Sequence, residues 1–303
     1  MSLPHRNTAA RPRLGDTIWT LARWYASKMN ESEFATALRE WRLPRDRYLS
    51  FIATMYPSVV GFNRALIRSI PKVDHVRRSG FVKALAEQLR EEQAHNQLWR
   101  QKMEAYGLDH LAVYEAFESY LAQFSVEELD RMTREVIEAF GEDLGNHSPG
   151  CFPDAEFPEA VLALYHHLWM SASRDDVDYW EHYASQSAIE VIIFDVVSTS
   201  VYPGIVGNPT LDAGPVSQQW WREHARQGAA EPGMRSDEEK HLELAQLMLN
   251  RGEIPAMMER RVADRADETM RLFAATLLYH DRESVEFSTD RYRRQPRPSK
   301  TAP

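Results

Sequence analysis

Glu92 and His95 form the first pair of residues in the chain whose types and spacing could bind a metal ion. Residues three apart share one face of a helix, so both side chains project in the same direction. Burying a carboxylate and an imidazole without partners is costly, and metal coordination compensates both groups at once. The face that they interrupt is otherwise apolar and carries Leu85, Leu89, Trp99 and Met103.

A second pair, Asp237 and His241, occurs late in the chain with the i, i+4 spacing of a helix. Leu244 and Met248 continue the same predicted stripe, so this pair is also expected to face the core. Glu238 lies three residues before the histidine and is a substitute ligand on a neighbouring face. Two such helices facing each other would make a cage of carboxylates and imidazoles.

Glu190 is the third candidate ligand, in the most hydrophobic part of the chain. It shares a predicted helix face with Tyr183, Ile193 and Val197, which is an unusual place for a free carboxylate. His182, on the same predicted helix, is a second substitute ligand. Taken singly, each of these motifs is more often a solvated or hydrogen-bonded pair. Their combination on three apolar helix faces favours a metal site.

The predicted ligand set consists of carboxylates and two imidazoles, without thiolates. Such a set suits iron or manganese, and carboxylate-bridged metal pairs inside helical bundles activate dioxygen. Zinc is a further chemical option, although a hydrolytic zinc site usually has three protein ligands and one open position. No nucleophilic Ser or Cys motif and no glycine-rich phosphate loop is present. We therefore predict no catalytic residue beyond the metal ligands.

Composition narrows the class of protein. The 303 residues are 43% hydrophobic and 27% charged, which is ample for a packed core. The net charge of −9 argues against nucleic-acid binding. The single cysteine, Cys151, excludes an intramolecular disulfide and a thiolate cluster. With no signal peptide and no membrane span expected, the prediction is a cytoplasmic protein.

Helical periodicity dominates the chain, and no strand pattern is evident. Residues 15–287 are expected to form one all-α domain, between a flexible segment at 1–14 and a flexible basic tail at 288–303. A capping-box pattern at Ser125 and Glu128 opens one helix, and Gly107 ends another. The helix that Gly107 ends covers 80–106. Asp16 is expected to cap a helix that carries Ile18, Leu21, Ala22 and Tyr25, and further helices are expected at 34–41, 45–70, 158–171, 175–200, 236–250 and 255–280.

The order Glu92-x-x-His95, Glu190, Asp237-x-x-x-His241 resembles the haem-oxygenase-like diiron oxidases, over about residues 15 to 285. The resemblance implies a seven-helix bundle and two iron ions that use dioxygen as co-substrate. It also implies oxidation of a small molecule, often derived from an amino acid or fatty acid, as in natural-product biosynthesis. Glu92 would bridge both irons, His95 would bind the first, and Glu190, Asp237 and His241 would hold the second. Phe51, Met55 and Tyr56 would line the substrate pocket, and a homodimer is compatible with the resemblance.

The chain departs from that family at its first long core helix, which normally supplies a carboxylate ligand. Here the helix at 45–70 offers only Asp46, at its start, so one metal ion or two remains open. A ferritin-like diiron protein is an alternative, because Glu238-x-x-His241 also fits a four-helix carboxylate cage. A metal-free protein of the same fold, acting as a cofactor-independent enzyme or as a binding partner, is another.

Overall fold

The computed structural model describes residues 13–140, 157–226, 236–251, 254–281 and 287–293, and leaves out the side chain of Asp237. Throughout these ranges the secondary structure is helical, without a β-strand, which confirms the predicted all-α class. The segment at 1–12, Cys151 and the tail from 294 onward lie outside the described residues.

Twelve α-helices follow one another in the described ranges, and the longer ones agree with the helices expected from the sequence. In chain order they are α1 (Leu14–Asn30), α2 (Glu33–Arg39), α3 (Arg45–Ser69), α4 (Ser79–Ala105), α5 (His110–Leu121), α6 (Val126–Ala139), α7 (Glu159–Ser173), α8 (Tyr179–Val196), α9 (Tyr202–Ile205), α10 (Pro215–Glu223), α11 (Asp237–Asn250) and α12 (Ala256–Leu278).

Local sequence signals set several helix ends. Ser125 and Glu128 form the expected reciprocal capping box at the start of α6. Gly107 follows α4 with φ of 76°, a left-handed conformation that glycine adopts without strain. Asp178 caps α8 with a second capping box, a few residues later than the start expected from the sequence.

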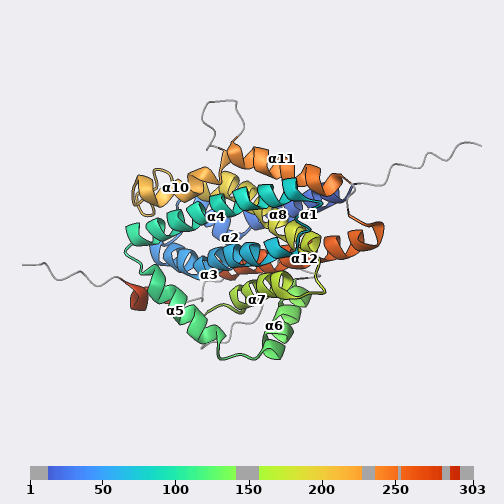
Figure 1. Ribbon diagram of the computed structural model, residues 1–303. Coiled ribbons are helices and arrows are strands. Elements are labelled where there is room, and N and C mark those ends of the chain that lie inside the picture. The colour runs from blue at the N-terminus through green and yellow to red at the C-terminus, as the bar shows by residue number, and fades with distance from the viewer. Residues whose placement is uncertain (1–12, 141–156, 227–235, 252–253, 282–286, 294–303) are drawn as a thin grey trace, which may run out of the picture.

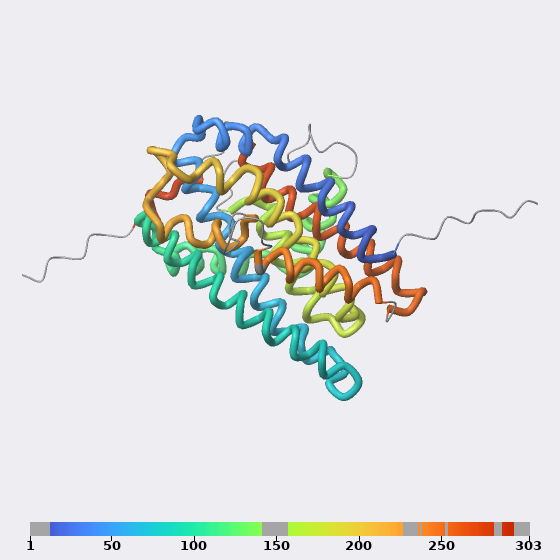
Figure 2. The backbone as a smooth tube through the Cα atoms, turned by 90° about the horizontal axis from the view of Figure 1, so that it is seen from above, coloured from blue at the N-terminus to red at the C-terminus, as the bar shows by residue number. Residues whose placement is uncertain are grey.

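Helix α8 lies at the centre of the bundle (Figures 1 and 2), where it packs against α12, α1, α11, α7 and α3. Its residues are buried on nearly all sides, which explains why its sequence is apolar all round. The stretch Tyr179–Ile205 is long and apolar enough to cross a membrane, but it is mostly buried inside the fold. After Val196 the chain continues as a π-helical turn, Val197–Val201, a distortion often found beside functional sites.

Helix α3 packs between α4 and α7 (Figure 1). Pro57 lies within α3 without ending it. Gly61 allows α7 to approach closely, because a Cβ atom at this position would lie 2.6 Å from the ring of Tyr165.

The start of the expected C-terminal tail is ordered. Phe287 and Tyr292 are buried and stack on each other, with ring centroids 5.6 Å apart. The amide of Asp109 donates to the carbonyl of Tyr292, and Arg293 pairs with Asp46 at 3.7 Å. Two aromatic side chains, which the basic composition concealed, fix residues 287–293 to the bundle.

Candidate metal centre

Glu190 from α8 and two residues of α11, Glu238 and His241, converge at one point. One potential ligand atom from each lies within 4.8 Å of the other two. Nε2 of His241 is 3.9 Å from Oε2 of Glu190. Donor atoms around a single ion of about 2.0–2.2 Å bond length have separations of this order, so the three groups could hold one metal ion.

The direction in which α11 faces decides its ligands. Its buried apolar residues are Leu242, Ala245 and Leu249, which share a face with Glu238. The sequence pattern predicted a core stripe at Leu244 and Met248 instead, but 46% of the Leu244 surface is exposed. That prediction was wrong at Leu244, while Met248 is partly buried against the core. Leucines at 242, 244, 247 and 249 occupy several faces of α11, so the spacing alone does not decide which face is buried.

Asp237, the ligand expected from the resemblance, begins α11, and its side chain lies outside the described residues. The described cluster draws on Glu238, the substitute ligand, three residues before His241. The α11 motif that the structure presents is therefore Glu-x-x-His, the same spacing as in α4.

Glu92 and His95 bring α4 to the same place. Nδ1 of His95 lies 3.5 Å from Oε1 of Glu92, and Glu92 is close enough to Glu190 for its charge to raise the pKa of that carboxyl. Four residues predicted as ligands and Glu238, predicted as a substitute, thus lie near one another on three helices. We call Glu92, His95, Glu190, Glu238 and His241 the carboxylate–histidine cluster.

The electrostatics of the cluster favour a bound cation. Burial raises the pKa of Glu190 well above its usual range, and the Glu92 carboxylate adds to the rise. Burial and the nearby Glu190 raise the pKa of Glu238 to about 8. Burial alone would lower the pKa of His95, but the carboxylates of Glu92, Glu238 and Glu223 outweigh it and raise the pKa to about 9. Crowded carboxylates of this kind need protons or a metal ion to offset their repulsion.

Two atoms of the cluster are buried without a hydrogen-bond partner among the described residues, Oε2 of Glu190 and Nδ1 of His95. The other oxygen of Glu190 is occupied, because the amide of Gln88 donates to Oε1 at 2.6 Å. Native proteins seldom leave buried carboxylate or imidazole atoms unsatisfied. The donor set, the orphaned atoms and the crowded charges all fit a metal ion in this position.

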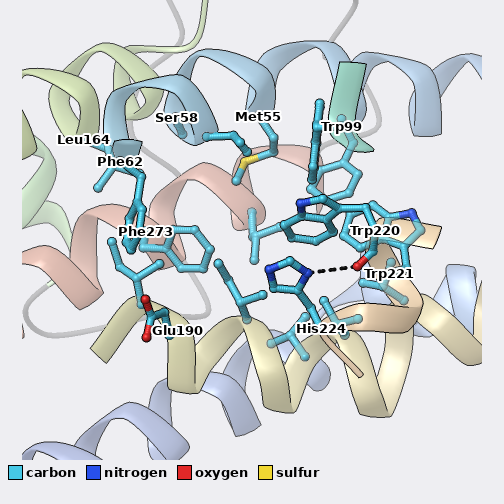
Figure 3. A pocket seen from close by; sticks show the side chains of 18 of the residues that line it. Met55, Ser58, Phe62, Trp99, Leu164, Glu190, Trp220, Trp221, His224 and Phe273 are labelled. Atoms are coloured by element: carbon cyan, nitrogen blue, oxygen red, sulfur yellow. Dashed lines mark hydrogen bonds between the residues drawn. The ribbon is translucent and has the colours of Figure 1, made fainter. Parts of the chain in front are cut away.

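On one side of the cluster lies a narrow apolar space of about 70 Å³, here called the inner cavity. Figure 3 shows Glu190 at one side and Trp220, Trp221 and His224 at the other, with Phe273 between. Several water-sized groups fit in such a volume, so it suits a slender apolar group. Its walls are formed by α3, α4, α7, α8, α10 and α12. Its residues include Phe51, Met55, Ser58, Val59, Phe62, Glu92, Trp99, Leu164, Ile193, Val197 and Leu277.

On the other side lies a wider polar space of about 560 Å³, here called the outer cleft. It is lined by His95, Glu238 and His241 of the cluster. Its other polar residues include Glu87, Gln88, Glu91, Glu223, Ser236 and Lys240. The cluster therefore separates an apolar interior from a polar opening. Small polar reactants and an apolar substrate could reach it from different sides.

Three tryptophans close the end of the inner cavity that lies away from Glu190. Trp99 and Trp220 meet edge to face at 4.7 Å, and the indole of Trp221 donates to the hydroxyl of Tyr48 at 2.9 Å. The amine of Lys102 lies 3.3 Å from the ring centroid of Trp221 and is completely buried. Burial lowers the pKa of this amine, while the ring faces attract its charged form. The tryptophan wall is thus packed from both sides.

The predicted pocket residues divide into two groups. Phe51 and Met55 line the inner cavity, as expected. Tyr56 does not, because its hydroxyl accepts a hydrogen bond from Arg100 at 3.1 Å on another face of α3. The one-residue step from Met55 turns the side chain by about 100° around the helix.

His182, the other substitute ligand, is not part of the cluster. It is buried two turns before Glu190 on α8, and burial together with the charge of Lys72 lowers its pKa to about 3. Asp46 at the start of α3 is exposed and pairs with Arg293. The α3 residues that line the inner cavity, Phe51, Met55, Ser58, Val59 and Phe62, carry no carboxylate. The structure therefore agrees with the sequence that α3 brings no carboxylate ligand to the cluster.

Sequence reasoning missed three polar residues at the site. Gln88 lies one turn before Glu92 on α4 and holds Glu190. Glu223 and His224 come from the end of α10, and the rings of His224 and His95 are 4.1 Å apart. In the sequence, an acid and an imidazole close to two tryptophans were a signal of a functional site. It was weak, because nothing in the local sequence shows that α10 packs on α4.

No protein-family profile matches the chain, and no curated protein matches its sequence. Among solved structures, it is similar to a TenA homologue from Pseudomonas syringae pv. tomato str. DC3000. The TM-score is 0.61 at 14% identity, over 91% of this chain and 96% of that one. Identity this low shows the fold alone. The chain accordingly has an all-α, haem-oxygenase-like fold, as the resemblance in its motifs implied.

Proposed function

We propose that the protein is a non-haem iron oxidase or oxygenase that uses dioxygen to oxidise a small molecule with a slender apolar group. The observation that carries this proposal is the convergence of Glu190, Glu238 and His241 within 4.8 Å. It is supported by the position of these residues between an apolar cavity and a polar cleft. Carboxylates and imidazoles without thiolates are ligands that suit iron or manganese.

In this proposal each residue of the cluster has its own role. Glu190, Glu238 and His241 would hold one iron, with Glu92 beside it and His95 on the side of α4. When bound, iron supplies the electrons that reduce dioxygen. Gln88 keeps Glu190 in one orientation by donating to Oε1.

The inner cavity would bind the apolar part of the substrate and exclude water from it. Phe62, Phe273 and Met55 provide its surface, and Ser58 offers a single hydroxyl. Contacts with these side chains would fix the carbon atoms of the substrate that lie closest to Glu92 and Glu190. Precise placement of the reacting carbon decides which bond is oxidised. The setting we propose is cytoplasmic, and natural-product biosynthesis is one context that suits such a reaction.

A ferritin-like function is the second candidate, and one observation favours it. The described ligands Glu92-x-x-His95, Glu190 and Glu238-x-x-His241 match the spacing of a ferritin-like carboxylate cage. The haem-oxygenase-like fold and the apolar cavity beside the cluster favour oxidation of an organic substrate. An iron-storing site has no use for a cavity lined mostly by hydrocarbon side chains.

The test is oxygen uptake by protein loaded anaerobically with ferrous iron and then mixed with aerated buffer and slender apolar compounds. We expect iron-dependent uptake that an apolar compound stimulates. The isosteric variant Glu190→Gln should lose at least about 10-fold of this rate, because a missing ligand costs no less than a missing supporting contact. Glu91→Gln, on the rim of the outer cleft, is the control. Uptake that ignores every organic compound would favour the ferritin-like function, and equal uptake without iron would contradict the proposal.

A further inference from the structure

The ring of His95 lies between two carboxylates from different helices. Nδ1 faces Oε1 of Glu92 at 3.5 Å, and Nε2 faces Oε2 of Glu223 at 3.9 Å. The two nitrogens lie on different edges of the ring, so a single metal ion can be bound by only one of them. A metal-binding histidine usually donates the N–H of its other nitrogen to a carboxylate, a carbonyl or water.

The surroundings of His95 show which nitrogen faces the cluster. Nδ1 is buried and has no hydrogen-bond partner among the described residues. It lies on the side of Glu92, whose carboxylate is close to that of Glu190. Nε2 points instead toward the end of α10. The arrangement leaves Nδ1 for the metal and Nε2–H for Glu223.

Helix α10 holds Glu223 in a suitable position. Its residues Trp220 and Trp221 pack against Trp99 of α4, at ring distances of 4.7 and 5.2 Å. The amide of Gln219 donates to Oε1 of Glu223 at 3.1 Å, which leaves Oε2 for His95.

The neighbouring His224 is already committed elsewhere. Its Nδ1–H donates to the carbonyl of Trp220 at 2.9 Å, and its ring stacks on Trp220. Glu223 is therefore the α10 residue that is free to serve His95. Its side chain is 38% exposed and can close the remaining distance of about 1 Å to a normal hydrogen bond.

We propose that Glu223 is a positioning residue for the metal centre, and that it fixes His95 as an Nδ1 ligand by accepting the proton of Nε2. This inference rests on the proposed metal-binding function. It gives α10 a role that the motifs in α4, α8 and α11 do not reveal. It also explains how His95 is oriented when α3 brings no carboxylate to that side of the cluster.

The experiment uses the full chain, labelled with ¹⁵N-histidine and loaded with zinc, a diamagnetic probe for the iron site. Long-range proton–nitrogen NMR identifies the metal-bound nitrogen of each histidine. Competition with a chromophoric chelator gives the zinc affinity. The variants are Glu223→Gln and His95→Ala, with Glu91→Gln as the matched control on the same cleft.

We expect the wild type to show His95 bound through Nδ1 and protonated at Nε2. Glu223→Gln should lower the zinc affinity by about 10- to 100-fold and shift the Nε2 resonance of His95. Glu91→Gln should change neither. Circular dichroism should show the same helix content in all variants, because Glu223 and Glu91 are partly exposed.

Two results would overturn the role of Glu223 alone: wild-type affinity in Glu223→Gln with an unchanged His95 spectrum, or ligation of His95 through Nε2. In both cases the metal site itself would stand. Equal zinc binding by the wild type and His95→Ala would show that His95 is not a ligand, and would also overturn the inference. Absence of zinc and iron binding by the wild type would remove both this inference and the proposed function.

Discussion

The inner cavity and the outer cleft, which flank the carboxylate–histidine cluster, shift the pKa of a histidine in opposite directions. His224, on the inner cavity, is buried among tryptophans, and burial lowers its pKa well below the usual range. His95, on the outer cleft, is almost as enclosed, yet nearby carboxylates raise its pKa to about 9. Their rings are only 4.1 Å apart. The boundary between an apolar and a charged environment therefore runs between two neighbouring side chains.

This contrast shows what the fold contributes to the site. Helices α3 and α12 supply only apolar residues and one serine to the inner cavity, while α4 and α11 supply charged residues to the outer cleft. Such a division lets a metal ion bind on the polar side while its neighbourhood on the other side stays dry. Electrostatic interactions are stronger in a dry site.

Removal of an outer-side ligand should have the largest effect. In His241→Ala we expect iron affinity to fall by more than about 100-fold, beyond what loss of a supporting contact costs. Iron-dependent oxygen uptake should disappear with it. Glu243→Gln, on an exposed face of the same helix, is the control and should keep both. Wild-type iron binding in His241→Ala would break the assignment of the outer side as the metal-binding side.

A bulky substitution in the inner cavity should weaken the binding of an apolar compound without affecting iron binding. Met55→Trp fills the inner cavity, so binding of 1-octanol, measured by calorimetry, should weaken at least about 10-fold. The extra volume should also cost about 1–3 kcal/mol of stability. Iron stoichiometry should remain that of the wild type. Loss of iron with retained octanol binding would reverse the roles that we assign to the two sides.

Acid should destabilise the apolar half of the bundle through its buried histidines. Burial lowers the pKa of His167 and of His280 to about 3, so each stays neutral when folded and takes up a proton below pH 6.5 when unfolded. The unfolded state then binds more protons, and stability falls as the pH falls from 6.5 toward 3, by about 1.4 kcal/mol per pH unit for each histidine.

Denaturant unfolding of the metal-free protein at pH 7, 6 and 5 measures this slope. His167→Gln, which can keep a hydrogen bond to Thr269, should remove one histidine's share of it. An unchanged slope in this variant would mean that His167 is protonated in the folded state.

The smallest effect should come from Tyr56, which lies one residue beyond the cavity-lining Met55. Tyr56→Phe removes only the hydroxyl that accepts from Arg100, so we expect a loss of about 0.5–1.5 kcal/mol in the free energy of unfolding. Octanol affinity should stay within about 2-fold of the wild type. A large loss of octanol binding would place Tyr56 in the pocket after all, as the sequence suggested.

The sequence alone predicted much of the fold and of the cluster. The spacing of Glu92 and His95, and the apolar surroundings of Glu190, carry geometric information, because residues three or four apart on a helix share a face. The rule is less specific at α11, because Asp237 and Glu238 are adjacent and helix spacing alone does not decide between them. The role of Glu223 could not be predicted from the sequence, because its neighbour His95 is 128 residues earlier and no local pattern indicates that contact.

The most direct test of the metal centre is the anomalous diffraction signal of iron in crystals of the iron-loaded protein. We predict a peak bonded to Glu190, Glu238 and His241, with distances of about 2.0–2.2 Å, between the inner cavity and the outer cleft. A peak elsewhere in the bundle, or iron-loaded crystals with no peak beside Glu190, would contradict the assignment.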